Sequence, residues 1–183
     1  MDPGTVDRDA AFTEWVRSQR SLLMRTAYLL CGDAHLAEDL VQTSLTRLYL
    51  AWPRVATMDW PNAYARRALI NAHIDMTRRP WWSRERSVGA APVPPPGHGQ
   101  PAVEDSADRA ATGSLLIAAL LTLAPGQRRV VVLRHLWDLS VSQTAEELGC
   151  STGTVKSQDS DALRRLSQML SWPSTADNRQ EES

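Results

Sequence analysis

The first third of the chain shows two stretches in which apolar positions recur with a helical period. In residues 12–30 the spacing is close to 3.6, and Gly32 follows as a helix-ending residue. Asp33 is suited to cap a second helix, which is expected to run to about Trp52, before Pro53. The apolar face of this second helix comprises Leu36, Leu40, Val41, Leu45, Leu48 and Tyr49.

A third helix is predicted from Pro61, because proline is tolerated in a first helical turn. It is expected to end at Arg79, before Pro80. Residues 86–106, RSVGAAPVPPPGHGQPAVEDS, then break the pattern with proline, glycine and alanine and few large apolar side chains. This composition predicts an extended tether without a packed core.

Helical periodicity returns after the tether. Residues 110–123 form one apolar helix, and Pro125 opens another that reaches about Trp137. No strand pattern and no internal repeat appears, so the fold class is all-α, with two helical domains joined by a flexible linker rich in proline and glycine. The expected boundaries are residues 8–82, linker 83–109, residues 110–171, and a disordered tail at 172–183.

The stretch LSVSQTAEELGCSTGTVKSQDSDALRRL, residues 139–166, predicts a helix-turn-helix. Ser140 and Gln143 form an S-x-x-Q capping box, Gly149 suits a sharp corner, and Ser151 caps the second helix. Val155, Ala162 and Leu166 form a buried stripe on that second helix. The outward positions are Thr152, Gly153, Lys156, Ser157 and Ser160. Small polar residues and one cation suit an approach to DNA, and a plain helical hairpin is the alternative.

Charge and composition add limits rather than a function. The formal net charge is −1, but residues 61–86 hold six arginines (Arg66, Arg67, Arg78, Arg79, Arg84 and Arg86) against two carboxylates. Such a block indicates either a phosphate-binding surface or a solvated helix face. Cys31 and Cys150 lie far apart and the four histidines are scattered, so we expect no disulfide framework, no metal and no cofactor. The polar N-terminus predicts no signal peptide, and the longest apolar run is about half a membrane span. A cytoplasmic protein is expected.

The stretch LAPGQRRVVVLRHLWDLSVSQTAEELGCSTGTVKSQDSDALRRL resembles the C-terminal domain of extracytoplasmic-function sigma factors, in particular small actinobacterial ones. In the first block, AEDLVQTSLTRLYLAWPRV resembles their polymerase-binding helix and PNAYARRALINAHIDMTRRPWW their minus-10 segment. Asn71 and Asp75 stand where the family has Asn and Asp. The resemblance covers about residues 10–170 and implies a promoter-specificity subunit of bacterial RNA polymerase, without enzymatic activity.

The resemblance also implies which residues bind DNA. The minus-10 candidates are Asn62, Arg66, Arg67, Asn71, Arg78, Arg79, Trp60 and Met58, with Trp60 and Met58 as walls of a pocket for a flipped base. Alternatively, Trp60 closes the helix start as a hydrophobic staple. Trp81 and Trp82 either stack on DNA or pack under the first block. The minus-35 candidates are Thr152, Gly153, Thr154, Lys156, Ser157 and Ser160.

Core polymerase is the second partner that the resemblance implies, through its β′ clamp and β flap. The candidates for the clamp are Asp39, Gln42, Leu45 and Arg47, although Leu45 and Leu48 are also plausible core residues. Relatives often carry Arg where this chain has Asp161, and Asp159 adds a second carboxylate near the DNA-binding positions. Both carboxylates are expected to weaken phosphate binding, although Asp can also accept a hydrogen bond from cytosine N4.

Two other functions compete with a sigma factor. A stand-alone helix-turn-helix repressor would need self-association and a palindromic site, but neither the basic third helix nor the tether. An enzyme would need more than His73 and Asp75, which lie two residues apart and point to different faces of a helix. The expected partners are therefore core polymerase, promoter DNA and, in this family, an anti-sigma factor, with a monomer as the free state.

Overall fold

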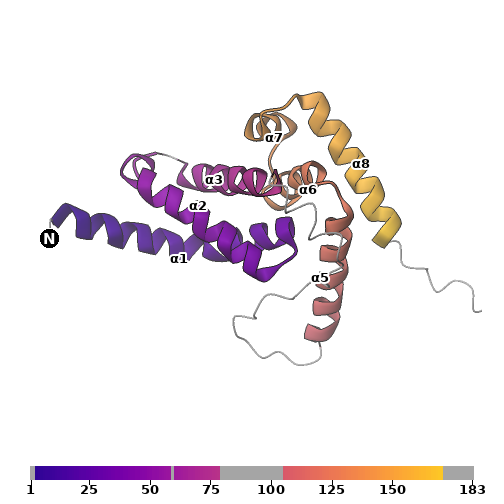
Figure 1. Cartoon of the computed structure of the whole chain (residues 1–183), viewed down its shortest axis with the longest axis horizontal. Helices are drawn as coiled ribbons and strands as arrows, with labels where there is room; N and C mark the ends of the chain where they lie inside the picture. The colour runs from indigo at the N-terminus through magenta and orange to yellow at the C-terminus, as the bar shows by residue number, and fades with distance from the viewer. Residues whose placement is uncertain (1–2, 59, 79–104, 171–183) are drawn as a thin grey trace, which may run out of the picture. The chain divides into compact units, whose positions relative to one another are not determined.

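The structure, a computed structural model, describes residues 3–58, 60–78 and 105–170 (Figure 1). Every element in these ranges is a helix, which confirms the all-α class. The described helices divide between two compact units. The first holds α1, α2 and α3, and the second holds α5, α6, η1, most of α7, and α8. The boundaries expected near residue 82 and at 83–104 lie outside the described residues.

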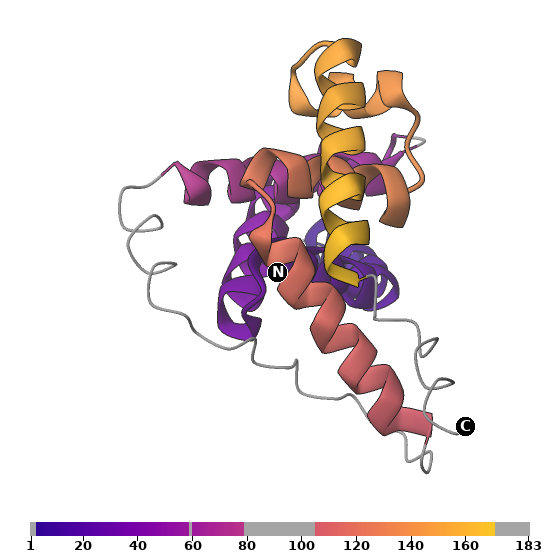
Figure 2. The same cartoon turned by 90° about the vertical axis from the view of Figure 1, so that its right-hand side faces the viewer.

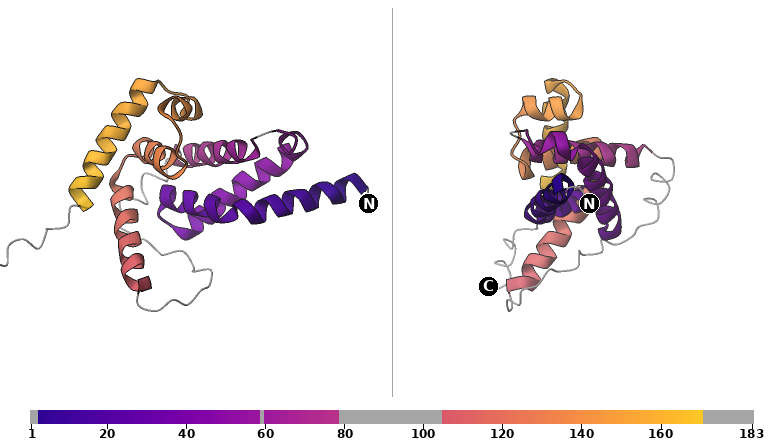
Figure 3. Two further views of the ribbon diagram at one scale, coloured as in Figure 1. Left: turned by 180° about the vertical axis from the view of Figure 1, so that it is seen from behind. Right: turned by 90° about the vertical axis from the view of Figure 1, so that its left-hand side faces the viewer.

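The first unit contains α1 (Pro3–Cys31), α2 (Ala34–Val55) and α3 (Pro61–Thr77). Helix α2 packs against both of the others, as the view from behind shows (Figure 3). Gly32 adopts a φ of 73° at the end of α1, and its N–H donates to the Tyr28 carbonyl at 2.7 Å. Asp33 then caps α2 by accepting from the Leu36 N–H at 2.9 Å. Both predictions for this corner are confirmed.

Three predicted helix limits in this unit are wrong, and one of them is the end of α3, which lies at Thr77, short of the expected Arg79. Helix α1 begins at Pro3, upstream of the periodic stretch, and α2 continues through Pro53 to Val55. Proline at position 53 removes one N–H that would bond to the Tyr49 carbonyl, which is a cost in a helix. The last turn nevertheless persists, because Trp52 and Val55 are buried and the Ala56 N–H donates to the Trp52 carbonyl at 2.8 Å.

An aromatic cluster joins α1 to the C-terminal half of α2. The Phe12 ring lies 5.1 Å from the Tyr49 ring and 5.1 Å from the Trp52 ring, in edge-on arrangements. The Trp15 ring lies 5.6 Å from that of Trp52. These edge-on and tilted contacts suit the charge distribution of aromatic rings and add to the burial of their apolar area. They fix α1 against α2 along the half that precedes α3.

The second unit begins with α5 (Asp105–Thr122), which starts before the predicted residue 110. Residues 105–109, expected to belong to the linker, are therefore helical. Helix α6 (Pro125–Val131) continues into η1 (Val132–Leu136), a short π-helical segment. Helices α7 (Val141–Leu148) and α8 (Thr152–Leu170) follow. Helix α8 packs on α6 and α5, and Figure 2 shows α8 alongside α6.

A buried arginine closes the end of α5. Arg128 is fully buried, and its guanidinium donates to the carbonyls of Leu120 at 2.8 Å, Leu121 at 3.1 Å and Leu123 at 3.0 Å. The last carbonyls of a helix have no partner within it and carry its negative dipole end, so a cation is favoured there. Arg128 thereby connects α5 to α6.

We expect Arg128→Met to destabilise the second unit by about 3 kcal/mol, since three carbonyls lose a charged donor inside the core. Amide hydrogen exchange on the whole chain should then be about a hundredfold faster in α5 and α6. The control is Arg165→Met, at an exposed position of α8. Unchanged exchange in Arg128→Met would show that the cap is dispensable.

Candidate nucleic-acid interfaces

The corner between α7 and α8 has the geometry of a helix-turn-helix. Gly149 adopts a φ of 63°, and the Ser151 hydroxyl accepts from the Thr154 N–H at 3.0 Å. At the start of α7, the Gln143 N–H donates to the Ser140 hydroxyl at 3.1 Å, and the Ser140 N–H donates to the Gln143 side-chain carbonyl at 2.8 Å. The predicted capping box, corner and cap are all present.

Helix α8 separates buried from exposed positions as predicted. Val155 and Ala162 are fully buried and Leu166 is 7% exposed, which confirms the buried stripe. All six minus-35 candidates near the N-terminus of α8 are exposed: Thr152, Gly153, Thr154, Lys156, Ser157 and Ser160. The first turns of α8 therefore present one cation and several small polar groups to solvent.

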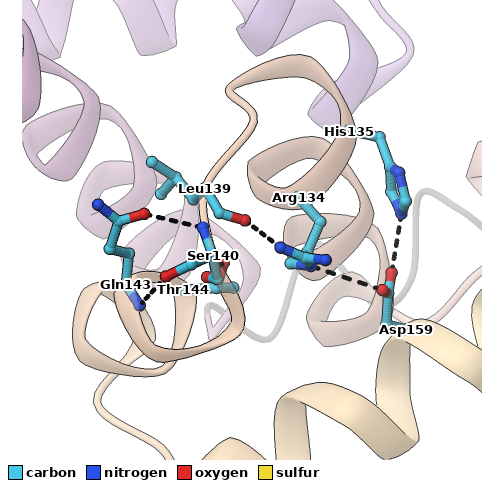
Figure 4. A network of polar contacts seen from close by, with 7 residues as sticks. All are labelled: Arg134, His135, Leu139, Ser140, Gln143, Thr144 and Asp159. Carbon is cyan, nitrogen blue, oxygen red and sulfur yellow. Dashed lines mark hydrogen bonds and ion pairs between the residues drawn. The ribbon is translucent and has the colours of Figure 1, made fainter.

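The structure places Asp159 away from this exposed face, in a network that sequence reasoning missed (Figure 4). One carboxylate oxygen lies 3.0 Å from Nε2 of His135, and the other lies 3.7 Å from Nε of Arg134. Arg134 also donates to the Leu139 carbonyl, immediately before the capping box at Ser140. The network thus connects the middle of α8 to η1 and to the start of α7.

Asp161 remains on the surface, beside a cation of the same helix. Its carboxylate accepts from Arg164 at 2.5 Å, and the two side chains are 42% and 64% exposed. An exposed pair of this kind contributes little to stability. Its effect on the surface is to offset the charge of Arg164.

The minus-10 candidates on α3 do not share one face. At about 100° per residue, Asn71 and Arg78 lie within about 40° of Arg67, while Asn62 lies about 140° away. Arg67, Asn71 and Arg78 are exposed, whereas Arg66 is half-buried. Arg79 lies outside the described residues, as do Trp81 and Trp82. The outer face of α3 therefore carries Arg67, Asn71 and Arg78.

The turn before α3 is more exposed than a hydrophobic staple allows. Trp60 is 74% exposed and Met58 is 43% exposed, so the interpretation of Trp60 as a staple is wrong. Trp60 occupies the cap position of α3 without a side-chain hydrogen bond. Two large apolar side chains consequently project from this turn.

The candidates for polymerase binding lie along two grooves beside α2. Asp39 and Arg47 line a groove of about 490 Å³ between α2 and α3. Leu45 lines a second groove, of about 360 Å³, between α1 and α2. Gln42 borders both grooves. Arg47 also pairs with Asp75 of α3 at 3.2 Å. Leu45 is half-buried, while Leu48 is fully buried and belongs to the core.

Two pKa shifts accompany the packing of α1. A hydrogen bond to Tyr49 raises the pKa of the Arg8 guanidinium, and burial raises the pKa of the Tyr28 phenol, with a smaller contribution from Asp33. Both directions favour the form that is ordinary at neutral pH, so neither alters the charge of the grooves.

His73 is buried and Asp75 is exposed, so the two do not form a catalytic pair.

Among the described residues, no helix is long and apolar enough to cross a membrane, and no cluster of three His, Cys, Asp or Glu side chains has the arrangement of a metal site.

Two family models match the chain in the order of its two units. Sigma-70 region 2 matches residues 15–83, and sigma-70 region 4 matches residues 114–166. The RNA polymerase sigma-E factor of Streptomyces coelicolor is 42% identical over 161 residues, with 87% of this chain and 85% of the relative covered. The ECF RNA polymerase sigma factor SigL of Mycobacterium tuberculosis is 32% identical over 150 residues, with 80% of this chain and 81% of the relative covered.

Solved structures show the same fold. The sigma factor RpoE of Bartonella quintana, solved in complex with the anti-sigma factor NepR, has a TM-score of 0.62 at 24% identity, covering 89% of this chain and 98% of that one. CnrH, solved with the cytosolic domain of CnrY, has a TM-score of 0.57 at 20% identity, covering 91% of each chain.

We expect Gly149→Ala to lower stability by about 1–2 kcal/mol, because alanine is strained at a φ of 63°. No atom lies within 4 Å of an added Cβ, so this effect is one of backbone conformation alone. Gly113→Ala, within α5 and equally open, should instead raise stability by about 1 kcal/mol. Thermal unfolding of both variants checks the opposite signs, and equal shifts would contradict them.

Proposed function

This chain belongs to the extracytoplasmic-function sigma factors of bacterial RNA polymerase, and we propose that its two units divide promoter recognition between them. As a sigma factor it binds core polymerase, directs it to promoters and takes part in opening the DNA. The first unit would read the minus-10 element and the second the minus-35 element. The observation that carries this division is that each unit matches one DNA-binding region of the family and exposes a polar helix face.

In the second unit, α8 is the helix that would enter the major groove. A recognition helix contacts base edges with its first turns while the preceding helix crosses the backbone. The six exposed residues Thr152, Gly153, Thr154, Lys156, Ser157 and Ser160 occupy those turns. Lys156 would bind a phosphate or a guanine edge, and the small neighbours permit close approach.

In the first unit, Arg67, Asn71 and Arg78 would follow the DNA along the outer face of α3. Arg67 and Arg78 would bind phosphates on either side of Asn71. Asn71 can make paired hydrogen bonds to a base edge. Met58 and Trp60 project from the turn before α3 and offer stacking surface to a base that has left the duplex. Arg66, Asn62 and Arg79 remain candidates, with Arg66 the least accessible of the described ones.

The two grooves beside α2 would receive the polymerase β′ clamp. Asp39 and Gln42 are exposed, Leu45 supplies apolar surface, and Arg47 is held toward α3 by Asp75. The second unit exposes Leu115, Leu116, Met169 and Leu170, which suit an apolar contact with the β flap. These partners imply a role in binding rather than in catalysis. They also place the protein in the cytoplasm, where polymerase and chromosome meet.

An anti-sigma factor is a further partner that we infer. RpoE and CnrH have this fold, and RpoE was solved with the anti-sigma factor NepR and CnrH with the cytosolic domain of CnrY. Exposed apolar side chains on the second unit and open grooves on the first give such a regulator surfaces to cover. Covering them would prevent polymerase binding.

The function is tested by mixing the purified chain with bacterial core RNA polymerase. We expect co-elution on gel filtration and run-off transcripts from genomic fragments that core polymerase alone does not produce. The starts of those transcripts would also give the promoter sequence. Absence of binding to core, with tight binding of free palindromic DNA, would support the repressor instead.

We expect Asp161→Arg to tighten binding of the second unit to minus-35 DNA and to steepen the salt dependence of this binding, because a carboxylate near phosphate becomes a cation. Asp161→Asn should have a smaller effect of the same sign, since it releases Arg164. Asp159→Asn is the matched control: its carboxylate faces His135 and Arg134, so it should not tighten binding. Fluorescence anisotropy across a salt series measures all three, and equal affinities for wild type and Asp161→Arg would refute the role of this charge.

A further inference from the structure

One side chain of α1 contacts both flanks of the turn that carries Met58 and Trp60. The Trp15 ring lies 5.6 Å from the Trp52 ring, near the end of α2 and before the turn. Its indole N–H donates to the Asn62 side-chain carbonyl at 3.1 Å, in the first turn of α3 and after it. Trp15 is therefore a bridge across the turn, supplied by a different helix.

The turn has few other restraints among the described residues. The Met58 N–H donates to the Val55 carbonyl at 3.0 Å, and the Trp60 carbonyl accepts from Ala63 at 3.1 Å. These bonds are local and do not fix the turn to the rest of the unit. Trp60 itself caps α3 without a side-chain hydrogen bond. The hydrogen bond from Trp15 to Asn62 joins the start of α3 to α1 through side chains.

Trp15 is itself held firmly enough to serve as a fixed point. Its ring stacks on Phe12 with the centroids 6.5 Å apart, and Phe12 packs edge-on against Tyr49 and Trp52. A group that must meet a base leaving the duplex has to be positioned in advance, because movement of the turn would reduce the gain from stacking.

We propose that Trp15 is a positioning residue for promoter opening, which holds the turn bearing Met58 and Trp60 by contacting Trp52 on one side and Asn62 on the other. This inference rests on the proposed role of Met58 and Trp60 in capturing a base. Trp15 would not touch DNA in this arrangement.

The experiment uses holoenzyme assembled from core polymerase and the full chain, on a promoter recovered by the run-off assay. Trp15→Phe removes the indole N–H and keeps an aromatic ring. We expect the extent of opening, measured by permanganate reactivity of unpaired thymines, to fall about fivefold, the effect of one hydrogen bond. Affinity for core polymerase should stay at the wild-type value.

Tyr49→Phe is the matched control. It removes two hydrogen bonds between α1 and α2, because the Tyr49 hydroxyl donates to Asp9 at 2.8 Å and accepts from Arg8 at 3.0 Å. It leaves Trp15 and Asn62 unchanged, so opening should remain at the wild-type extent. Equal losses in Tyr49→Phe and Trp15→Phe would show that general packing of α1 is responsible, which overturns the proposal.

A double-mutant cycle with Asn62→Ala tests the path of the effect. Asn62 is exposed, so this variant should fold. In the Asn62→Ala background, Trp15→Phe should change opening by less than about twofold, because the shared bond is already absent. Full additivity of the two substitutions would rule out positioning through Asn62.

Trp60→Ala separates this inference from the function on which it rests. Reduced opening in Trp60→Ala with wild-type opening in Trp15→Phe overturns the inference and leaves the role of the turn intact. Wild-type opening in both variants overturns the inference together with the role of Trp60. Reduced opening in both, with the control unchanged, supports the two together.

Discussion

Each DNA-binding surface of this protein depends on a helix that is buried along one stripe and exposed along the opposite one. In α8, burial of Val155, Ala162 and Leu166 fixes the rotation of the helix about its axis, and this rotation alone decides which residues reach solvent. In α3, the buried alanines and Leu69 fix the outer face in the same way. Function in both units is therefore placed by the apolar residues, although polar residues carry it out.

Local features of the fold could be predicted from the sequence, because they depend on neighbours within a few residues. The Asp33 cap, the Ser140–Gln143 box and the glycine corners at Gly32 and Gly149 are of this kind. The cap of α5 by Arg128, the pairing of Asp159 with His135, and the bond from Trp15 to Asn62 join different helices. A single sequence does not specify which distant positions meet, so these were missed. The sequence left two interpretations of Trp60 open, a pocket wall or a staple, because the pattern does not indicate whether a tryptophan at a helix start packs inward.

The effective charge of α8 likewise depends on contacts that its sequence does not specify. A count of residues places two carboxylates, Asp159 and Asp161, on a helix that is meant to approach phosphate. The structure turns one of them inward against Arg134 and His135 and sets the other beside Arg164. Formal charge along a sequence therefore overstates the repulsion that DNA meets, because side chains of neighbouring elements neutralise part of it.

The network around Asp159 links α8, η1 and the beginning of α7 before any DNA is present. A helix-turn-helix fixed in this way has little disorder to lose when it meets its site. Its binding should therefore show a small change in heat capacity, in contrast to that of a segment that folds on contact. Selection among promoters would then be expressed mainly in how long a complex lasts, rather than in how often one forms.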